Sequence, residues 1–196
     1  MNLNEQQLID LALRYYPHEY DEDDPNFESS PERRAYYAAW DRAPSFEHWF
    51  KVVEAIRKDL GGLSVYDATQ GRGRPSFRCV ARVKEQSLVA GAQLETLVVG
   101  LRSALAPIYG VAWVQRILAP QPVKERPWHG FSVEIPEELA SIADVVGRHI
   151  EQESGFQRLS AELARVRVPL IFVDSVFYGE ATLFDALLDY DPANVP

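Results

Sequence analysis

The chain has 196 residues, of which 46% are hydrophobic, and its 29 acidic against 20 basic residues give a formal net charge of -9. A chain of this length can bury a substantial core. Its excess of acid argues against nonspecific binding to nucleic acid or to an anionic membrane, because contacts with phosphate groups need Lys and Arg. The single cysteine, Cys79, excludes an internal disulfide and a cysteine-rich zinc site. The N-terminus lacks the basic and apolar regions of a secretory signal, so we expect a cytoplasmic protein, with a cysteine-poor exported protein as the alternative.

The charge is distributed unevenly along the chain. Residues 1–60 carry a net charge of -6, residues 61–130 a net charge of +5, and residues 131–196 a net charge of -8. Segments of opposite sign attract one another when they fold together, and any acidic surface that remains steers a basic partner toward the protein.

The first third of the chain is predicted to be helical. Asn4 caps an apolar-periodic segment that ends at Pro17. Residues 19–26 are predicted to form a solvated acidic loop. Ser30 before Pro31 begins a second helix, and Ser45 begins a third, which closes at Gly61-Gly62.

The middle of the chain changes to a period of two residues, which is typical of strands. In residues 77–84 the apolar side chains alternate with Arg78, Val80, Arg82 and Lys84, which predicts one buried face and one basic face in water. Residues 94–101, 109–118 and 131–135 are further strand candidates. Their close spacing favours antiparallel pairing.

The last third is predicted to return to helix. Residues 136–150 begin with Pro136-Glu137-Glu138, whose acids suit a helix N-terminus. A second helical segment is expected over residues 156–166, a buried strand over 168–173 and a short helix over 181–188.

These elements predict a single α+β domain over residues 1–196. It would contain an antiparallel sheet from the central region, packed against N-terminal and C-terminal helices. Residues 1–62 are helical in this interpretation, residues 63–135 are mainly strands, and residues 136–196 are helices with one buried strand.

The sharpest short motif is Gly71-Arg72-Gly73-Arg74-Pro75. Its Arg-Gly-Arg-Pro core resembles the AT-hook, whose arginines enter the minor groove of DNA. A Gly/Pro turn with solvated arginines explains the motif better, because it lies between predicted strands in an acidic chain. A further alternative is that these arginines hold an anionic ligand, and the possible contacts for an anion or ligand are Arg72, Arg74, Arg78 and Arg82.

No catalytic motif, metal-ligand pattern or cofactor motif is present in the sequence. The segment His18-Glu19-Tyr20-Asp21 is better explained as a hydrated loop than as a metal site. Cys79 falls on the predicted inward face of its strand, which favours an ordinary core thiol over a nucleophile. We therefore expect no metal, no cofactor and no catalytic residue, although distant residues can still assemble an active site.

Aromatic residues and acids gather in the first third, and adjacent pairs such as Tyr36-Tyr37 cannot both face one core. Aromatic anchors with acids on the rim are the ingredients of a protein-binding surface. A core layer beneath a solvated acidic exterior explains the same pattern and is slightly favoured. The residues assigned to the predicted partner-binding surface are Glu19, Tyr20, Asp21, Glu22, Asp23, Asp24, Phe27, Tyr37 and Trp40.

In size, acidity and lack of catalytic motifs, the chain is broadly similar to immunity proteins of bacterial polymorphic toxin systems. This resemblance implies a noncatalytic protein that neutralises a basic partner, such as a toxin. From the excess of acid we expect neither nucleic acid nor membrane as a partner. The alternative is a small-molecule enzyme or ligand-binding domain, with a cleft between the basic strand face and the helices. A deep pocket with converging His, Asp and Arg side chains would favour the enzyme.

Overall fold

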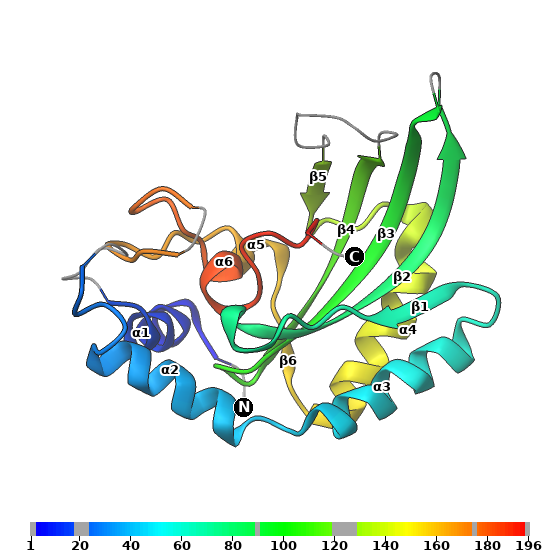
Figure 1. Ribbon diagram of the computed structural model, residues 1–196. Helices are drawn as coiled ribbons and strands as arrows, with labels where there is room; N and C mark the ends of the chain where they lie inside the picture. Colours follow the sequence, from blue (N-terminus) through cyan, green and yellow to red (C-terminus); the bar gives the residue numbers. More distant parts are fainter. Residues whose placement is uncertain (1–2, 18–23, 89–90, 119–128, 174–175, 195–196) are drawn as a thin grey trace.

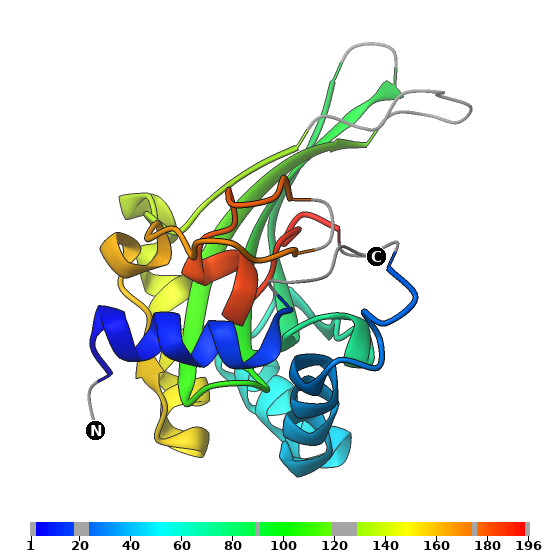
Figure 2. The ribbon, with the colours of Figure 1, turned by 90° about the vertical axis from the view of Figure 1, so that its left-hand side faces the viewer.

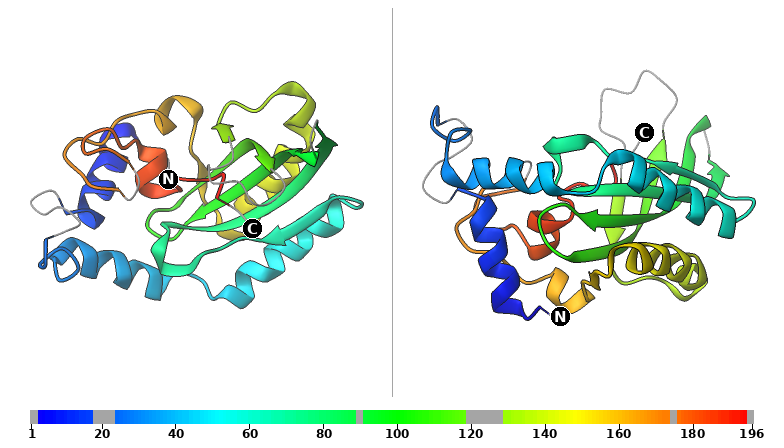
Figure 3. Two further views of the ribbon diagram at one scale, coloured as in Figure 1. Left: turned by 45° about the horizontal axis from the view of Figure 1, so that its top comes forward. Right: turned by 90° about the horizontal axis from the view of Figure 1, so that it is seen from below.

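The computed structural model describes residues 3–17, 24–88, 91–118, 129–173 and 176–194. It has an α+β fold in which an antiparallel sheet from the middle of the chain packs between helices from both ends, as predicted (Figure 1). Both views in Figure 3 place α1 (Glu5–Tyr15) and α2 (Pro31–Arg42) at one end of the molecule, and α4 (Glu137–Ser154) at the other.

The three N-terminal helices begin where the sequence predicts. Asn4 and Gln7 form a capping box at the start of α1, which satisfies two backbone N–H groups reciprocally. The Ser30 hydroxyl accepts a hydrogen bond from the Arg33 backbone N–H before α2, and Ser45 caps α3 (Phe46–Asp59) in the same way. These polar caps fix the register of each helix, and therefore which side chains face the core.

The sheet has the order β1-β2-β3-β4-β5, and all these neighbours are antiparallel. A short strand that the sequence did not predict pairs with β4 in parallel. A 3-10 turn, η1 (Gly71–Gly73), connects β1 to β2. The strands are β1 (Ser64–Asp67), β2 (Ser76–Ser87), β3 (Gln93–Ser103), β4 (Ile108–Leu118), β5 (His129–Ser132) and β6 (Gln157–Arg158). Figure 2 shows the far ends of β2 and β3 projecting beyond the helices.

One face of the sheet packs against α3 and α4. Trp49 of α3 packs against Phe77 of β2, with ring centroids 5.8 Å apart. On the neighbouring strand, Gly100 allows α4 to approach closely, because an added Cβ would lie 2.5 Å from Val146 and 2.9 Å from Ile150. The core on this face therefore depends on a residue without a side chain.

The opposite face is covered by α6 (Leu183–Leu187) and the residues that follow it. Phe131 of β5 stacks on Phe184 of α6, with ring centroids 5.5 Å apart. Leu188 lies so close to Gly110 of β4 that a Cβ there would be 2.6 Å from its Cδ1 atom.

The prediction of a water-facing basic side on β2 is wrong for Arg78 and Val80 and holds at Lys84. Arg78 and Val80, which were expected in water, are completely buried. The reason is that the segment after α6 folds back over this face, where Asp189 neutralises Arg78. Only the last part of the strand is exposed.

Two predictions for the last third also need correction. Residues 156–166 contain strand β6 and the four-residue helix α5 (Ala161–Ala164) instead of one longer helix, because the backbone N–H groups of Gln157 and Leu159 donate to the carbonyls of Pro107 and Tyr109. Residues 168–173 do not form a strand. Pro169 lacks a backbone donor and Leu170 has a positive φ of 60°, so the chain turns there.

None of the helices in the described part of the chain combines the length and apolar character required to cross a membrane.

Candidate binding site

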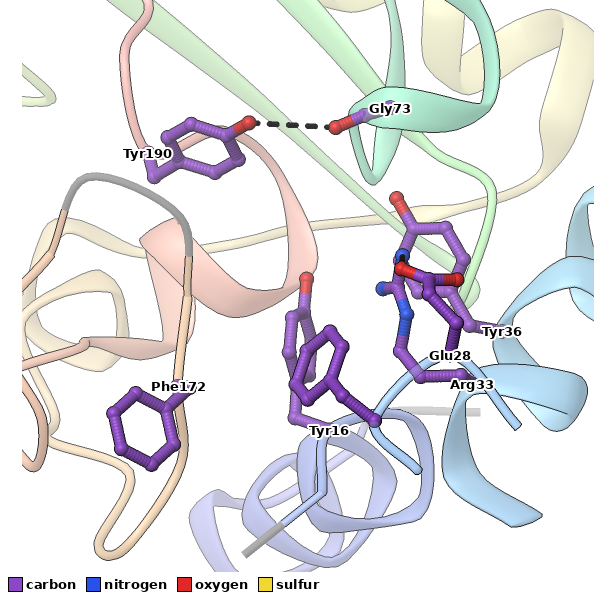
Figure 4. Close-up of a pocket in the computed structure, with 8 residues that line it drawn as sticks. Tyr16, Glu28, Arg33, Tyr36, Gly73, Phe172 and Tyr190 are labelled. Carbon is purple, nitrogen blue, oxygen red and sulfur yellow. Dashed lines mark hydrogen bonds and ion pairs between the residues drawn. The ribbon is translucent and has the colours of Figure 1, made fainter. Parts of the chain in front are cut away.

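A pocket of about 380 Å³ lies where α1, α2, η1 and the C-terminal segment meet (Figure 4). Its volume is in the range of small-molecule and side-chain binding sites. Five of the eight described residues that line it are aromatic, and the charged ones among these eight are Glu28 and Arg33. The lining residues are Tyr16, Phe27, Glu28, Arg33, Tyr36, Gly73, Phe172 and Tyr190.

Arg33 is the central polar residue of the pocket. The cap at Ser30 places Arg33 in the first turn of α2, where Tyr36 and Tyr37 follow at helix-face spacing. Its guanidinium carbon lies 4.7 Å from the Tyr36 ring centroid and 5.0 Å from that of Tyr37. It also lies 5.3 Å from the Phe27 ring centroid. These cation–π contacts hold the guanidinium in one position.

The hydrogen bonds of Arg33 are incomplete. Its Nη2 donates to the Tyr37 hydroxyl at 3.0 Å and lies 3.5 Å from a Glu28 oxygen. The Tyr37 hydroxyl in turn donates to the other Glu28 oxygen at 2.8 Å. The Nε of Arg33 is buried and has no acceptor among the described residues.

The floor of the pocket consists of neutral tyrosines. Tyr16 donates a hydrogen bond of 2.7 Å to the Ala186 carbonyl, and its ring packs edge-on against Tyr36 at 6.1 Å. Burial raises the pKa of both hydroxyls well above 10, because a phenolate cannot be solvated there. These tyrosines therefore act as hydrogen-bonding and packing groups, not as bases.

Tyr190 and Gly73 form the opposite wall (Figure 4). The Tyr190 hydroxyl donates to the Gly73 carbonyl at 3.4 Å. The guanidinium of Arg74 lies 3.8 Å from the Tyr190 ring centroid, on which it stacks. This wall therefore depends on the position of Arg74.

A buried ionic cluster lies next to this wall. Asp189 is completely buried, and its two oxygens lie 3.1 Å from Arg74 Nη1 and 2.6 Å from Arg78 Nη1. Arg78 also donates from Nε to the Ala68 carbonyl and from Nη2 to the Asn194 carbonyl. The cluster attaches the C-terminal segment to β2 and to the turn that precedes it.

The four arginines predicted to contact an anion occupy different environments. Arg72 is exposed and pairs with Asp41. Arg74 and Arg78 are buried in the ionic cluster. Arg82 is half-buried and pairs with Glu95 at 2.9 Å; Glu95 also pairs with Arg116 at 2.7 Å. Each of the four therefore has a carboxylate partner within the protein.

The residues predicted to bind a partner are only partly brought together. Glu19, Tyr20, Asp21, Glu22 and Asp23 lie outside the described residues. Asp24 accepts hydrogen bonds from the backbone N–H and side chain of Asn26, and Phe27 and Tyr37 meet at Arg33. Trp40 lies in the core, where its indole donates to the Arg74 carbonyl at 2.9 Å.

A second group of aromatic residues, which the sequence analysis did not assign to a site, lies beside the pocket. The aromatic loop, comprising Phe172, Phe177 and Tyr178 together with the aliphatic Leu170, precedes α6 and lies on the same side of the molecule as α1 (Figure 1). Phe177 is 86% exposed, Leu170 57% and Tyr178 45%. The Phe172 and Tyr178 rings are 4.4 Å apart, and Phe172 lines the pocket.

The sequence contained one signal for this loop. Phe177 and Tyr178 are adjacent, so both rings cannot face one core, and the glycine that follows them, Gly179, indicates a turn. Arg33 carried no such signal, because a charge on a helix is normally solvated.

Comparisons with models of known protein families, with curated proteins and with solved structures found no match. Among the described residues, no group of three or more His, Cys, Asp or Glu side chains has the arrangement of a metal site. The function is therefore inferred from the pocket and its surroundings alone.

Proposed function

We propose that this chain is a noncatalytic binding protein of the bacterial cytosol that neutralises a basic protein, such as a toxin. The observation that carries the proposal is the exposed aromatic loop at the edge of an aromatic pocket. Large exposed apolar patches mark sites of protein association. Aromatic side chains at their centre contribute most of the binding energy.

The charge of the surroundings supports a basic partner. Glu28 is an exposed acid at the pocket, and the chain just before it is rich in acids in the sequence, from Glu19 to Asp24. The whole chain has a net charge of -9. Such a potential speeds the encounter with a cationic protein and disfavours acidic partners.

The state of the pocket residues supports a noncatalytic role. The Tyr16 and Tyr36 hydroxyls stay protonated because burial raises their pKa, and the lining residues that the structure describes include no histidine. The arrangement suits the insertion of an apolar or cationic side chain of a partner between aromatic rings.

The test is affinity capture from extract of the native cells at low and high salt, followed by measurement of Kd with the purified partner. We expect a basic protein whose binding weakens at high salt.

The Phe177→Ser variant should raise Kd by about 10-fold or more, since truncation of an interface anchor typically costs over 1 kcal/mol. Its free energy of unfolding should change little, because the ring is in water.

Phe50→Ser provides the matched control, since Phe50 is 50% exposed on α3 and belongs to neither the pocket nor the aromatic loop. Its Kd should equal that of the wild type. A captured partner that binds both variants equally, or that is acidic, would contradict the proposal. A partner whose expression harms cells equally with and without this protein would contradict the neutralising role.

A further inference from the structure

A second pocket, of about 280 Å³, lies where the turn between β3 and β4 meets the C-terminal ends of α1 and α2. It shares no lining residue with the first pocket. Among the described residues that line it, the charged ones are two arginines, and none is an acid. The lining residues are Tyr15, Ala39, Arg42, Ala43, Pro44, Arg102, Ser103, Ala104, Leu105, Ala106, Pro107 and Phe156.

Arg102 lines this pocket, and most of its side chain is buried. The residue is 8% exposed, and within the described ranges its guanidinium has no hydrogen bond or ion pair. Its position is set by two rings instead, since the guanidinium carbon lies 4.4 Å from the Phe156 ring centroid and 5.8 Å from that of Phe77. Cation–π contacts hold a guanidinium but leave its N–H groups free to bind an acceptor.

The other buried arginines differ from Arg102 in this respect. Arg74 and Arg78 share Asp189, and Arg116 pairs with Glu95. Burial of a charge is unfavourable unless it is paired, and a carboxylate pairs with each of these three arginines. Arg102 lacks a partner of this kind.

Nearby groups do not supply the missing acceptor. Glu153 is close enough to favour the charged form of Arg102, but it is half exposed and lies 2.9 Å from His48 Nε2. The Ser103 hydroxyl accepts hydrogen bonds from the Leu105 and Ala106 backbone N–H groups. Burial lowers the pKa of Arg102 to about 10, so the guanidinium is still cationic at neutral pH.

The remaining walls define the kind of anion. Tyr15 and a second arginine, Arg42, also line the pocket. Ala39, Ala43 and Leu105 are apolar, so they suit a short hydrocarbon group. A guanidinium binds the two oxygens of a carboxylate in a planar fork.

We propose that this pocket binds a small organic carboxylate, with Arg102 as its charged contact and the surrounding alanine, proline and leucine side chains around its hydrocarbon part. The site is independent of the proposed protein-binding surface, since the two use different residues. It assigns a role to a largely buried arginine that forms no ion pair with a described residue.

The test is titration of the full-length protein with sodium butyrate at pH 7, by calorimetry and by the shift in Tm, with sodium chloride at equal ionic strength as reference. We expect saturable binding and a rise in Tm with butyrate concentration. Inorganic phosphate should bind more weakly, because it cannot fill the apolar part. An equal response to phosphate would overturn the assignment to a carboxylate.

Arg102→Met keeps an unbranched stem between the two rings and removes the charge. It should weaken butyrate binding about 10- to 100-fold, the range typical of a lost charged hydrogen bond. Without butyrate, its Tm should equal or exceed that of the wild type, because an unpaired buried charge has been removed. Arg148→Met, which removes an exposed arginine on α4, should leave butyrate binding unchanged.

Arg42→Gln provides a second variant that does not disturb the core, because Arg42 is exposed. It should weaken butyrate binding several-fold without a change in Tm. Absence of saturable butyrate binding in the wild type, or equal binding in Arg102→Met, would overturn the proposal.

Discussion

At the scale of single residues, burial sets the chemistry of the groups that are reactive in other contexts. Cys79 lies in the core of β2, and burial raises the pKa of its thiol to about 12. Burial and a nearby carboxylate, Glu151, likewise raise the pKa of Tyr109 to about 12. Both groups stay neutral at physiological pH, so neither is a nucleophile in the folded protein.

Cys79 should therefore be inert toward thiol reagents while the protein is folded. At pH 8 an ordinary cysteine is partly thiolate, whereas the raised pKa leaves almost none at Cys79, and its burial excludes the reagent. We expect no reaction with Ellman's reagent in buffer and complete reaction of one thiol per chain in 6 M guanidinium. Rapid labelling of the folded protein at pH 8 would show that the thiol is accessible.

At the scale of elements, the starts of the N-terminal helices could be predicted because they depend on residues close in sequence. The starts of α1, α2 and α3 follow from Asn4, Ser30 and Ser45, because a cap bonds to backbone two or three residues away. The burial of Arg78 could not be predicted in this way. Its partner, Asp189, is 111 residues distant, and alternation along β2 contains no information about what covers each face.

The contact between α4 and β3 is also a property of whole elements. The Cα of Gly100 faces Val146 and Ile150, and a Cβ there would also lie 2.8 Å from Cys79 Sγ. Gly100→Ala should therefore destabilise the fold by about 1–3 kcal/mol, the usual cost of overpacking a core. Urea denaturation monitored by tryptophan fluorescence measures this loss. Gly73→Ala is the control, since nothing lies within 4 Å of its added Cβ; equal stability of the two variants would show that α4 moves away without cost.

At the scale of the whole molecule, the charges of distant segments neutralise one another only in part. The positive middle segment pairs with the acidic C-terminal segment at Asp189, whereas Glu95 neutralises Arg82 and Arg116 from within the middle segment. The sequence therefore indicated that the segments attract, but not which acids would be used. The candidate site was harder to predict, because α1, α2, η1 and the C-terminal segment all contribute to one pocket.

The ionic cluster at Asp189 should be essential for the stability of the whole fold. Asp189→Asn keeps the size of the side chain but leaves Arg78 buried without a counter-charge, which typically costs about 3–5 kcal/mol. Chemical denaturation should show this loss as a lower midpoint. Asp41→Asn should change stability by less than about 1 kcal/mol, because Asp41 and Arg72 are exposed. A midpoint for Asp189→Asn that matches Asp41→Asn would contradict this role.

The sequence separation of this cluster has a consequence for biosynthesis. Arg78 leaves the ribosome 111 residues before Asp189, an interval of roughly 6–22 s at ordinary rates of translation. Hairpins form within microseconds, so the central strands have time to pair long before the acid that covers their arginines is synthesised. During that interval the nascent sheet presents unshielded cations, and the speed of translation, not of strand pairing, determines when this face closes.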